Sequence, residues 1–374
     1  MSPYLIQNFI IVTKQNRCIQ IGLLSCLFII ILNSCAIQPN TWNPPKKPEF
    51  AEIISLNERL THASQIPLLD YYGAEEFAID KDGNIFCGVH VGEKDFSSGA
   101  ILKINSNDSV EIFLVTNHWV TGMQFDQNGA LIALMNDIGL VKINQDKSID
   151  TLLTKTPQGQ RIRMGTGLKI DSDGIIYFVN ASSTSSTSWK YINKLILEMK
   201  PTGGIYSFDP ISNTTTTISE GNYFGNGLEI SDDEDFIIIS ETSKYRILKY
   251  WIKGNKKGQS EVFLDNLAGF PNNISKNKNG NFWIGFTTKR NDQLDKFHSK
   301  IGMKKLIYSL PSFVQPKPEK IGMVIEVSRN GQILQALFDS KGKIVKEAGA
   351  IIEYNGHLYL GGDVVPYISK LKIK

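Results

Sequence analysis

The sequence predicts an all-β fold, a six-bladed β-propeller of four-stranded blades, and three observations support it. A short phrase recurs six times: an apolar-alternating strand, an acidic or Asn-rich turn usually ending in Gly, and a second apolar strand. Asn-Gly and Asp-Gly supply the positive φ that a tight turn between two strands requires. The first three turn glycines, Gly83, Gly129 and Gly174, stand 46 and then 45 residues apart, a spacing typical of propeller blades.

The six copies follow one another along the chain, and each predicts a hairpin. They begin at Phe77, Met123, Leu168, Leu228, Ile274 and Ile351. The last copy predicts three strands, roughly 350–354, 357–361 and 367–373. We expect residues 50–55 to supply its fourth strand, because joining the two ends of the chain in one sheet leaves no exposed edge.

Two stretches interrupt the repeat and are interpreted as insertions between strands. One is the Ser/Thr-rich run 181–188 and the other is the Lys-rich segment 287–320. We expect both to cover the mouth of the central channel; plain solvated loops are the alternative interpretation.

The N-terminus reads as a targeting segment, residues 1–34. Lys14 and Arg17 precede an apolar run, 19–32, which has the length of a signal peptide and is short for a spanning helix. The run ends in Leu-Asn-Ser-Cys-Ala, which resembles a bacterial lipobox and predicts a lipid on Cys35. An uncleaved signal anchor is the alternative. Both interpretations export the protein and tether it to a membrane.

Residues 35–49 form a Pro-rich linker, suited to hold the propeller, residues 50–374, away from the membrane. After Cys35 only Cys87 remains, so no internal disulfide is expected. Cys87 alternates with apolar neighbours, which predicts a buried, inert thiol.

The charge balance argues against nucleic acid as a partner. The chain of 374 residues has a formal charge of +3, and beyond residue 34 there are 38 basic against 37 acidic residues. Nucleic-acid binding needs a concentrated basic face, which a nearly neutral domain with scattered charges does not predict.

Register along the repeat predicts a site. Two places before the first apolar residue of each copy stand Glu75, Thr121, Thr166, Asn226, Asn272 and Gly349. Because the first strand of each blade lines the central channel, these positions are expected to ring the axis. Carboxylate and amide oxygens gathered in this way suit a hard cation such as Ca²⁺. Asn and Gly before a strand are also ordinary turn residues, which is the structural alternative.

The stretch 224–285 resembles strictosidine-synthase-like proteins of the adipocyte plasma-membrane-associated type. The resemblance is carried by Phe224-Gly-Asn-Gly-Leu-Glu, Ile239-Ser-Glu, Gly269-Phe-Pro-Asn-Asn and Gly280-Asn-Phe-Trp, and it extends over about residues 55–374. These proteins belong to a six-bladed superfamily that also contains gluconolactonase/regucalcin and paraoxonase. The resemblance implies a central Ca²⁺ and the hydrolysis of lactones or aryl esters. By motif matching, it places the metal ligands at Glu75, Asn180, Asn226, Asn272 and Asn273.

This chain departs from the family pattern at four positions. Asn272 stands where relatives carry Asp, which removes a negative charge and is expected to weaken Ca²⁺ binding. Thr166 replaces the Asn of an Asn-Asp pair, and Thr121 stands in place of the histidine of paraoxonases. Gly349 occupies the place of the glutamate that strictosidine synthase uses as its acid/base, so amine–aldehyde condensation is not expected. Thr121 and Thr166 remain candidates for substrate contact.

No other catalytic motif is present in the sequence: there is no Gly-x-Ser-x-Gly elbow, His-Glu-x-x-His motif or phosphate loop. His90 and His118 could reach a site face, but a surface or loop role is the simpler interpretation, and no general base is identified. The leading prediction is a Ca²⁺-dependent hydrolase acting on a small ester or lactone. The alternative is a non-enzymatic propeller that binds a small ligand or a protein on its central face.

Overall fold

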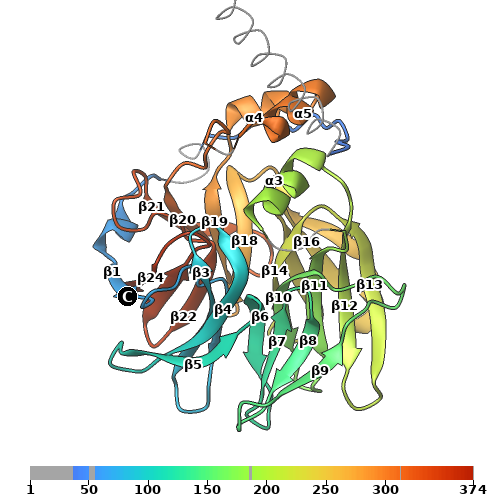
Figure 1. Cartoon of the computed structure of the whole chain (residues 1–374), viewed down its shortest axis with the longest axis vertical. Helices are drawn as coiled ribbons and strands as arrows, with labels where there is room; N and C mark the ends of the chain where they lie inside the picture. The colour runs from blue at the N-terminus through green and yellow to red at the C-terminus, as the bar shows by residue number, and fades with distance from the viewer. Residues whose placement is uncertain (1–36, 50–54, 185–187, 312, 374) are drawn as a thin grey trace, which may run out of the picture.

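Six four-stranded antiparallel sheets surround a central axis in the computed structural model, which describes residues 37–49, 55–184, 188–311 and 313–373 (Figure 1). The first strand of each repeat copy contacts the first strand of the next copy, and the sixth contacts the first. These six strands therefore form the inner wall of a closed ring. The predicted six-bladed propeller is confirmed.

Each blade runs from an inner to an outer strand in sequence order, except that the sixth takes its outer strand from the N-terminal side. The first three blades are β2 (Phe77–Ile79), β3 (Ile85–Gly92), β4 (Asp95–Ile104) and β5 (Val110–Thr116); β6 (Val120–Phe125), β7 (Leu131–Met135), β8 (Gly139–Ile143) and β9 (Ile149–Leu153); β10 (Met164–Ile170), β11 (Ile176–Ser182), β12 (Gly203–Asp209) and β13 (Thr214–Asn222). The last three are β14 (Gly225–Ile230), β15 (Phe236–Glu241), β16 (Arg246–Trp251) and β17 (Ser260–Leu264); β18 (Gly269–Lys276), β19 (Phe282–Lys289), β20 (Gly322–Val327) and β21 (Ile333–Asp339); β22 (Ala350–Tyr354), β23 (His357–Gly361), β24 (Tyr367–Lys372) and β1 (Ser64–Pro67).

The repeated turns are the hairpins that the sequence predicts. In the first, Asp80 Oδ1 accepts hydrogen bonds from the backbone N–H groups of Asp82 and Asn84, at 2.9 and 2.8 Å. Gly83 closes this turn with a φ of +83°, a conformation that glycine adopts without steric cost. The fourth copy has no turn glycine, and Glu234 adopts a φ of +55° in its place.

Ring closure occurs as predicted, but with a different segment. The three strands expected from the last copy are β22, β23 and β24, and the place beside β24 is taken by β1. The prediction that residues 50–55 complete this blade is therefore wrong in its residues; positions 50–54 lie outside the described part of the chain. Gln65 and Ile66 pair with Ser369 and Ile368. Ile66 points inward and is buried in the same cluster as Ile368, and this burial fixes the register of the pair.

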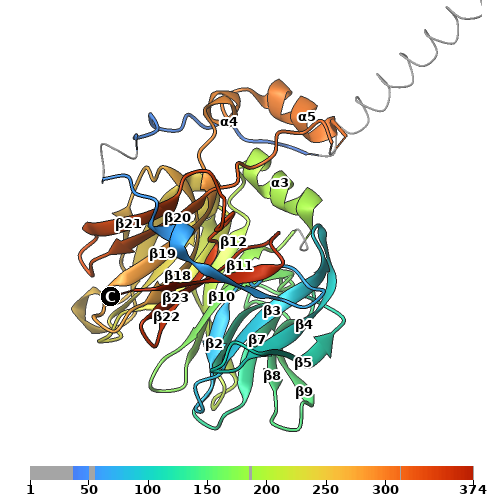
Figure 2. The same cartoon turned by 90° about the vertical axis from the view of Figure 1, so that its left-hand side faces the viewer.

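Three α-helices lie together over one face of the propeller (Figures 1 and 2). Helix α3 (Trp189–Glu198) joins β11 to β12, and α4 (Asp292–Phe297) and α5 (Ile301–Ser309) join β19 to β20. Both insertions leave from the end of the channel at which the innermost strands begin, because Ser182 pairs with Met164 and Lys289 pairs with Gly269. We call this the ring end of the channel, and the opposite one the far end. Short 3₁₀ helices cover Arg59–His62, Thr242–Lys244 and Gly254–Lys256.

The linker does not behave as a free spacer. Its described part, residues 37–49, lies along α3, α4 and α5, with Ile37 buried against Leu197 and Tyr308. Among the described residues no helix is long and apolar enough to cross a membrane. The predicted leader and Cys35 lie outside the described residues.

Candidate metal site on the propeller axis

The register positions of neighbouring blades lie next to one another at the ring end. Thr121 Oγ1 donates to Gly165 O at 2.8 Å, and Thr166 Oγ1 donates to Asn226 O at 3.2 Å. The backbone N–H of Asn273 donates to Gly349 O at 3.0 Å. The equivalent positions therefore meet around the axis, as the repeat register predicts.

One contact reaches beyond the adjacent blade. The side-chain amide of Asn273, in blade five, donates a hydrogen bond to the backbone carbonyl of Glu75, in blade one. A side chain can join these two blades only where the ring is narrow. The backbones of neighbouring blades are also close together at Gly227, where a Cβ would collide with the backbone of Asn272 and Asn273.

Four side-chain oxygens in this ring are buried without a hydrogen-bond partner among the described residues: Glu75 Oε2, Asn226 Oδ1, Asn272 Oδ1 and Asn273 Oδ1. Their residues are between 1% and 4% exposed. Buried acceptors are nearly always paired, because an unpaired one loses its interaction with water without replacement. Three of these acceptors stand at equivalent repeat positions and the fourth, on Asn273, is next in sequence to one of them. Together they form a donor set that fits an oxygen-seeking cation such as Ca²⁺.

The fifth predicted ligand differs from these four. Asn180 Oδ1 accepts from the backbone N–H of Met164 at 3.3 Å, and its Nδ2 donates to Arg161 O at 3.4 Å. Its side chain is thereby occupied in holding the start of β10. Thr121 and Thr166, predicted to contact substrate, use their hydroxyl hydrogens to tie one blade to the next.

Blade six adds two acidic residues that the sequence reasoning missed, Glu347 and Asp363. Burial raises the pKa of Glu75 well above its usual range, and the nearby Asp363 and then Glu347 raise it further. Burial and Asp363 likewise raise the pKa of Glu347. Asp363 Oδ1 is also buried without a hydrogen-bond partner in the described part of the chain. Among the register positions only Glu75 is acidic, but the structure places two further carboxyl groups near it.

The structure gives a steric reason for glycine at position 349. A Cβ at this position would lie 2.7 Å from Nδ2 of Asn272, so the amide of Asn272 occupies the space beside the glycine. The described residues contain no group of three or more His, Cys, Asp or Glu side chains arranged to hold a metal ion. A cation in the ring would depend on the amide oxygens together with Glu75.

The far end of the channel opens into a cavity of about 320 Å³, lined by Glu76, Lys169, Glu229, Asn273 and Ser275 among others. Lys169 Nζ lies 2.6 Å from Glu76 Oε1 and 4.0 Å from Glu229 Oε2. Burial raises the pKa of Glu76 to about 7 although Lys169 lowers it. Burial lowers the pKa of Lys169, but the two glutamates outweigh this and raise it. Here the buried carboxylates have a basic partner.

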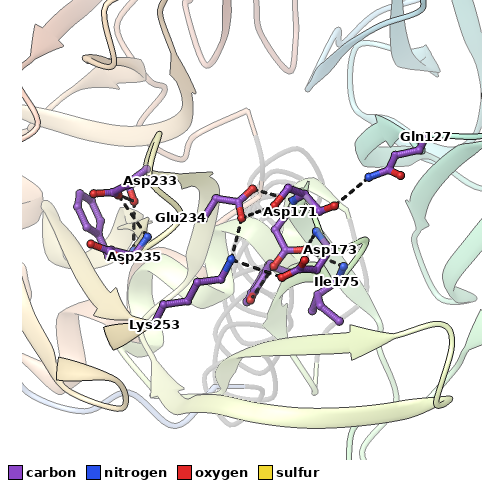
Figure 3. A network of polar contacts seen from close by, with 12 residues as sticks. Gln127, Asp171, Asp173, Ile175, Asp233, Glu234, Asp235 and Lys253 are labelled. Carbon is purple, nitrogen blue, oxygen red and sulfur yellow. Dashed lines mark hydrogen bonds and ion pairs between the residues drawn. The ribbon is translucent and has the colours of Figure 1, made fainter. Parts of the chain in front are cut away.

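The turns around this cavity are also tied together by polar contacts (Figure 3). Glu234, in the β14–β15 turn, accepts from Lys253 Nζ at 2.7 Å and from the backbone N–H of Ser172 at 2.7 Å. Gln127, in the β6–β7 turn, donates to Ser172 O at 2.9 Å. Three consecutive blades are thus linked at the far end by side chains of their own turns.

The remaining candidates do not form a second catalytic group. Cys87 is buried and free, as predicted, and burial raises the pKa of its thiol, which disfavours the reactive thiolate. His90 is fully buried, so its expected surface or loop role is wrong; its ring nitrogens contact Gly92 O and Asp363 O at 2.8 and 2.7 Å. It packs beside Asp363 and supports that loop.

Two family profiles and several known proteins match this chain. The strictosidine synthase family profile matches residues 166–255, and the profile of the strictosidine synthase-like N-terminal region matches residues 55–93. Strictosidine synthase-like 3 of Arabidopsis thaliana is 32% identical over 66% of this chain and 65% of its own length. Adipocyte plasma membrane-associated protein of Rattus norvegicus is 31% identical over 68% of this chain and 69% of its own length.

Solved structures share the fold at low sequence identity. A gluconolactonase from Xanthomonas campestris has a TM-score of 0.59 at 15% identity, covering 90% of this chain and 97% of its own. Regucalcin from Agrobacterium tumefaciens, described as a calcium-binding protein, has a TM-score of 0.55 at 12% identity, covering 83% and 94%. The molecule is thus a propeller of the six-bladed class. By sequence, the chain belongs to the strictosidine-synthase-like family that includes the adipocyte plasma membrane-associated proteins.

Proposed function

We propose that this protein is an exported, membrane-tethered propeller that hydrolyses lactones or aryl esters with the help of Ca²⁺ held at the ring end of its channel. The observation that carries the proposal is the set of unpaired, buried oxygens of Glu75, Asn226, Asn272 and Asn273. The names of the two structural relatives, a gluconolactonase and a calcium-binding regucalcin, support it.

The residues of the ring have distinct parts in this proposal. Glu75 supplies negative charge, and the three amide oxygens supply neutral ligands. When bound, a cation of this kind polarises an ester carbonyl and stabilises negative charge on its oxygen. Asp363 and Glu347 increase the negative charge around Glu75 and compensate for the carboxylate missing at position 272. Glu347 is buried, as is Oδ1 of the partly exposed Asp363, which limits the screening of that charge by bulk water.

A second candidate is a propeller that binds a small ligand without chemistry. Two observations favour it: Gly349 offers no proton-transfer group where strictosidine synthase has its glutamate, and the Thr121 hydroxyl is engaged with Gly165 O. On either candidate, strictosidine-type condensation is expected to be undetectable.

A calcium titration followed by a panel of lactones and aryl esters, with and without chelator, separates the two candidates. The hydrolase predicts turnover that chelator removes and calcium restores, in the parent and in a Cys87→Ala control alike. Calcium binding without turnover of any ester or lactone would favour the ligand-binding propeller. Turnover that survives chelation would contradict the metal-dependent proposal.

The tether is proposed to be a lipid on Cys35. Cys35→Ser should then block processing and leave a longer precursor, which gel mobility and membrane fractionation would detect. If the variant migrates and fractionates like the parent, the signal-anchor alternative replaces the lipid.

A further inference from the structure

The linker residues are fixed to the helices of the ring end by several independent contacts. Ile37 is 1% exposed and packs on Leu197 of α3 and Tyr308 of α5. The backbone N–H of Gln38 donates to Glu198 Oε1 at 2.8 Å, and Lys304 Nζ donates to Asn40 O at 2.7 Å. The described chain therefore starts on the surface formed by α3 and α5.

The linker stays in contact with the helices and their loops as far as Pro45. The backbone N–H of Trp42 donates to His298 O at 3.0 Å, and Arg290 Nη2 donates to Pro45 O at 2.8 Å. The Trp42 ring lies 4.5 Å from Lys244 Nζ and 5.2 Å from the His298 ring. A segment held at this many points has little freedom to act as a long spacer.

This attachment limits how far the domain can stand from a membrane. The apolar run 19–32 ends only five residues before Ile37. Five residues span at most about 18 Å, even when fully extended. A lipid on Cys35 would be nearer still. A tether inserted at either place therefore brings the α3–α5 surface to the membrane.

The surface near this attachment carries large exposed apolar side chains. On α5 and the loop after it, Ile301 is 43%, Leu306 40%, Phe313 81% and Val314 52% exposed. Exposed apolar residues scattered singly are ordinary, but these four stand within fourteen residues of one another, next to the attached linker, which makes this segment a candidate interaction surface.

The charge of this segment selects the kind of partner. Residues 301–320 contain four lysines and one acidic residue, Glu319, which forms an ion pair with Lys289 at 2.7 Å. One of them, Lys304, is buried under the linker, and Lys190 is exposed on neighbouring α3. Apolar side chains flanked by lysines suit the boundary of an anionic lipid bilayer, where the charges meet headgroups and the apolar groups enter the acyl region.

We propose that α5 and the loop 313–320, together with the exposed face of α3, form a docking surface for an anionic membrane. The proposal rests on the membrane tether proposed above and not on the hydrolase. In this orientation the ring end of the channel, with Glu75 and the unpaired amide oxygens, faces the lipid. The far end, with Lys169 and its glutamates, faces away from it.

Amide hydrogen exchange on the full chain tests this surface directly. The protein is compared in detergent, in phosphatidylcholine nanodiscs, and in nanodiscs that also contain phosphatidylglycerol. We expect residues 301–309 and 313–320 to exchange at least about tenfold more slowly in the anionic discs than in detergent, because a docked surface opens less often. The double variant Leu306→Asp, Phe313→Asp should lose this protection.

Ile211→Asp is the matched control. Ile211 is 90% exposed in the β12–β13 turn, at the far end, so the variant adds a charge without touching the docking surface. Equal exchange in detergent and in anionic discs, or protection of the β12–β13 turn instead, would overturn the proposal. Protection in detergent that grows with protein concentration would mean that a second copy covers the surface, which also overturns it.

Failure of the tether can be recognised separately. If the tether fails, the protein does not co-purify with nanodiscs. Phosphatidylglycerol-containing vesicles are then added to the untethered protein and its amide exchange is measured. The docking surface still predicts slower exchange in residues 301–309, and its absence there contradicts the proposal. Hydrolysis of a water-soluble ester in detergent reports on the channel site independently.

Discussion

Glu75 and Glu76 are consecutive residues with opposite surroundings, and the difference separates the two ends of the channel. Both are buried. Glu76 forms an ion pair of 2.6 Å with Lys169, and Glu229 lies on the other side of that lysine. Glu75 lies among unpaired amide oxygens, and its pKa is raised by burial and by two further acidic side chains.

This comparison teaches how two consecutive residues leading into β2 can serve two purposes. Successive side chains on an extended chain point in different directions, so one residue of register decides which environment a carboxylate enters. At the far end one basic group, Lys169, lies within reach of both glutamates, 2.6 Å from Glu76 and 4.0 Å from Glu229. At the ring end the chain gathers acceptors and carboxyl groups without a basic partner, an arrangement that a bound cation, or a proton on the carboxyl groups, would stabilise.

The largest expected effect comes from substituting each glutamate in turn. Glu75→Gln should lower calcium affinity by at least about a hundredfold, because it removes the carboxylate among the ring ligands, and should abolish metal-dependent turnover. Glu76→Gln should leave calcium affinity within about threefold. It should instead lower the free energy of unfolding by about 2–3 kcal/mol, because Lys169 loses its nearest partner.

Calorimetry for calcium affinity and denaturant unfolding for stability measure the two effects. Glu76→Gln serves as the control for Glu75→Gln, since the two variants make the same chemical change one residue apart. If the two substitutions weaken calcium binding equally, the distinction between the ends of the channel is wrong.

The pH dependence of stability without calcium should be the next largest effect. The raised pKa values of Glu75 and Glu347, and that of Glu76 near 7, mean that the folded protein binds more protons than the unfolded chain above about pH 4.5. The free energy of unfolding should therefore fall as pH rises from 5 to 8, by at least about 2 kcal/mol. Calcium should restore much of it, because it stabilises the ionised carboxylates.

Denaturant titrations at a series of pH values, with calcium or with chelator, check this expectation. Glu75→Gln should flatten the slope measured in chelator. A stability that rises across this pH range without calcium would show that these carboxyl groups are not held as described.

Asn272→Asp should have the smallest effect. It tests the same ring end by adding a carboxylate instead of removing one. The added carboxylate should raise calcium affinity by about tenfold, because it adds charge to a ligand already aimed at the ring. It should also lower the calcium-free stability by about 1 kcal/mol through repulsion of Glu75. Unchanged calcium affinity would mean that Asn272 does not face the bound cation.

The sequence predicted the elements that depend on local pattern. Each turn glycine marked a hairpin, and the register of the copies brought Glu75, Asn226 and Asn272, with the adjacent Asn273, to one end of the ring. These inferences succeeded because side-chain alternation and turn geometry are properties of a few consecutive residues.

Contacts between distant segments could not be predicted in this way. The outer strand of blade six is Ser64–Pro67, and a short strand at an edge carries little pattern of its own. Glu347 and Asp363 approach Glu75 from the opposite end of the chain, outside the register that defined the ring. Their only signal was their position on either side of blade six's inner hairpin, at its ring end.

A crystal structure of the protein grown with calcium, compared with one grown in chelator, tests the central claim most directly. The account predicts one cation on the axis, bound by Glu75 and by the side-chain oxygens of Asn226, Asn272 and Asn273 at about 2.3–2.6 Å. The Lys169 pairs at the far end should be the same in both crystals. A ring without a cation at saturating calcium, or a cation bound at the far end instead, would contradict it.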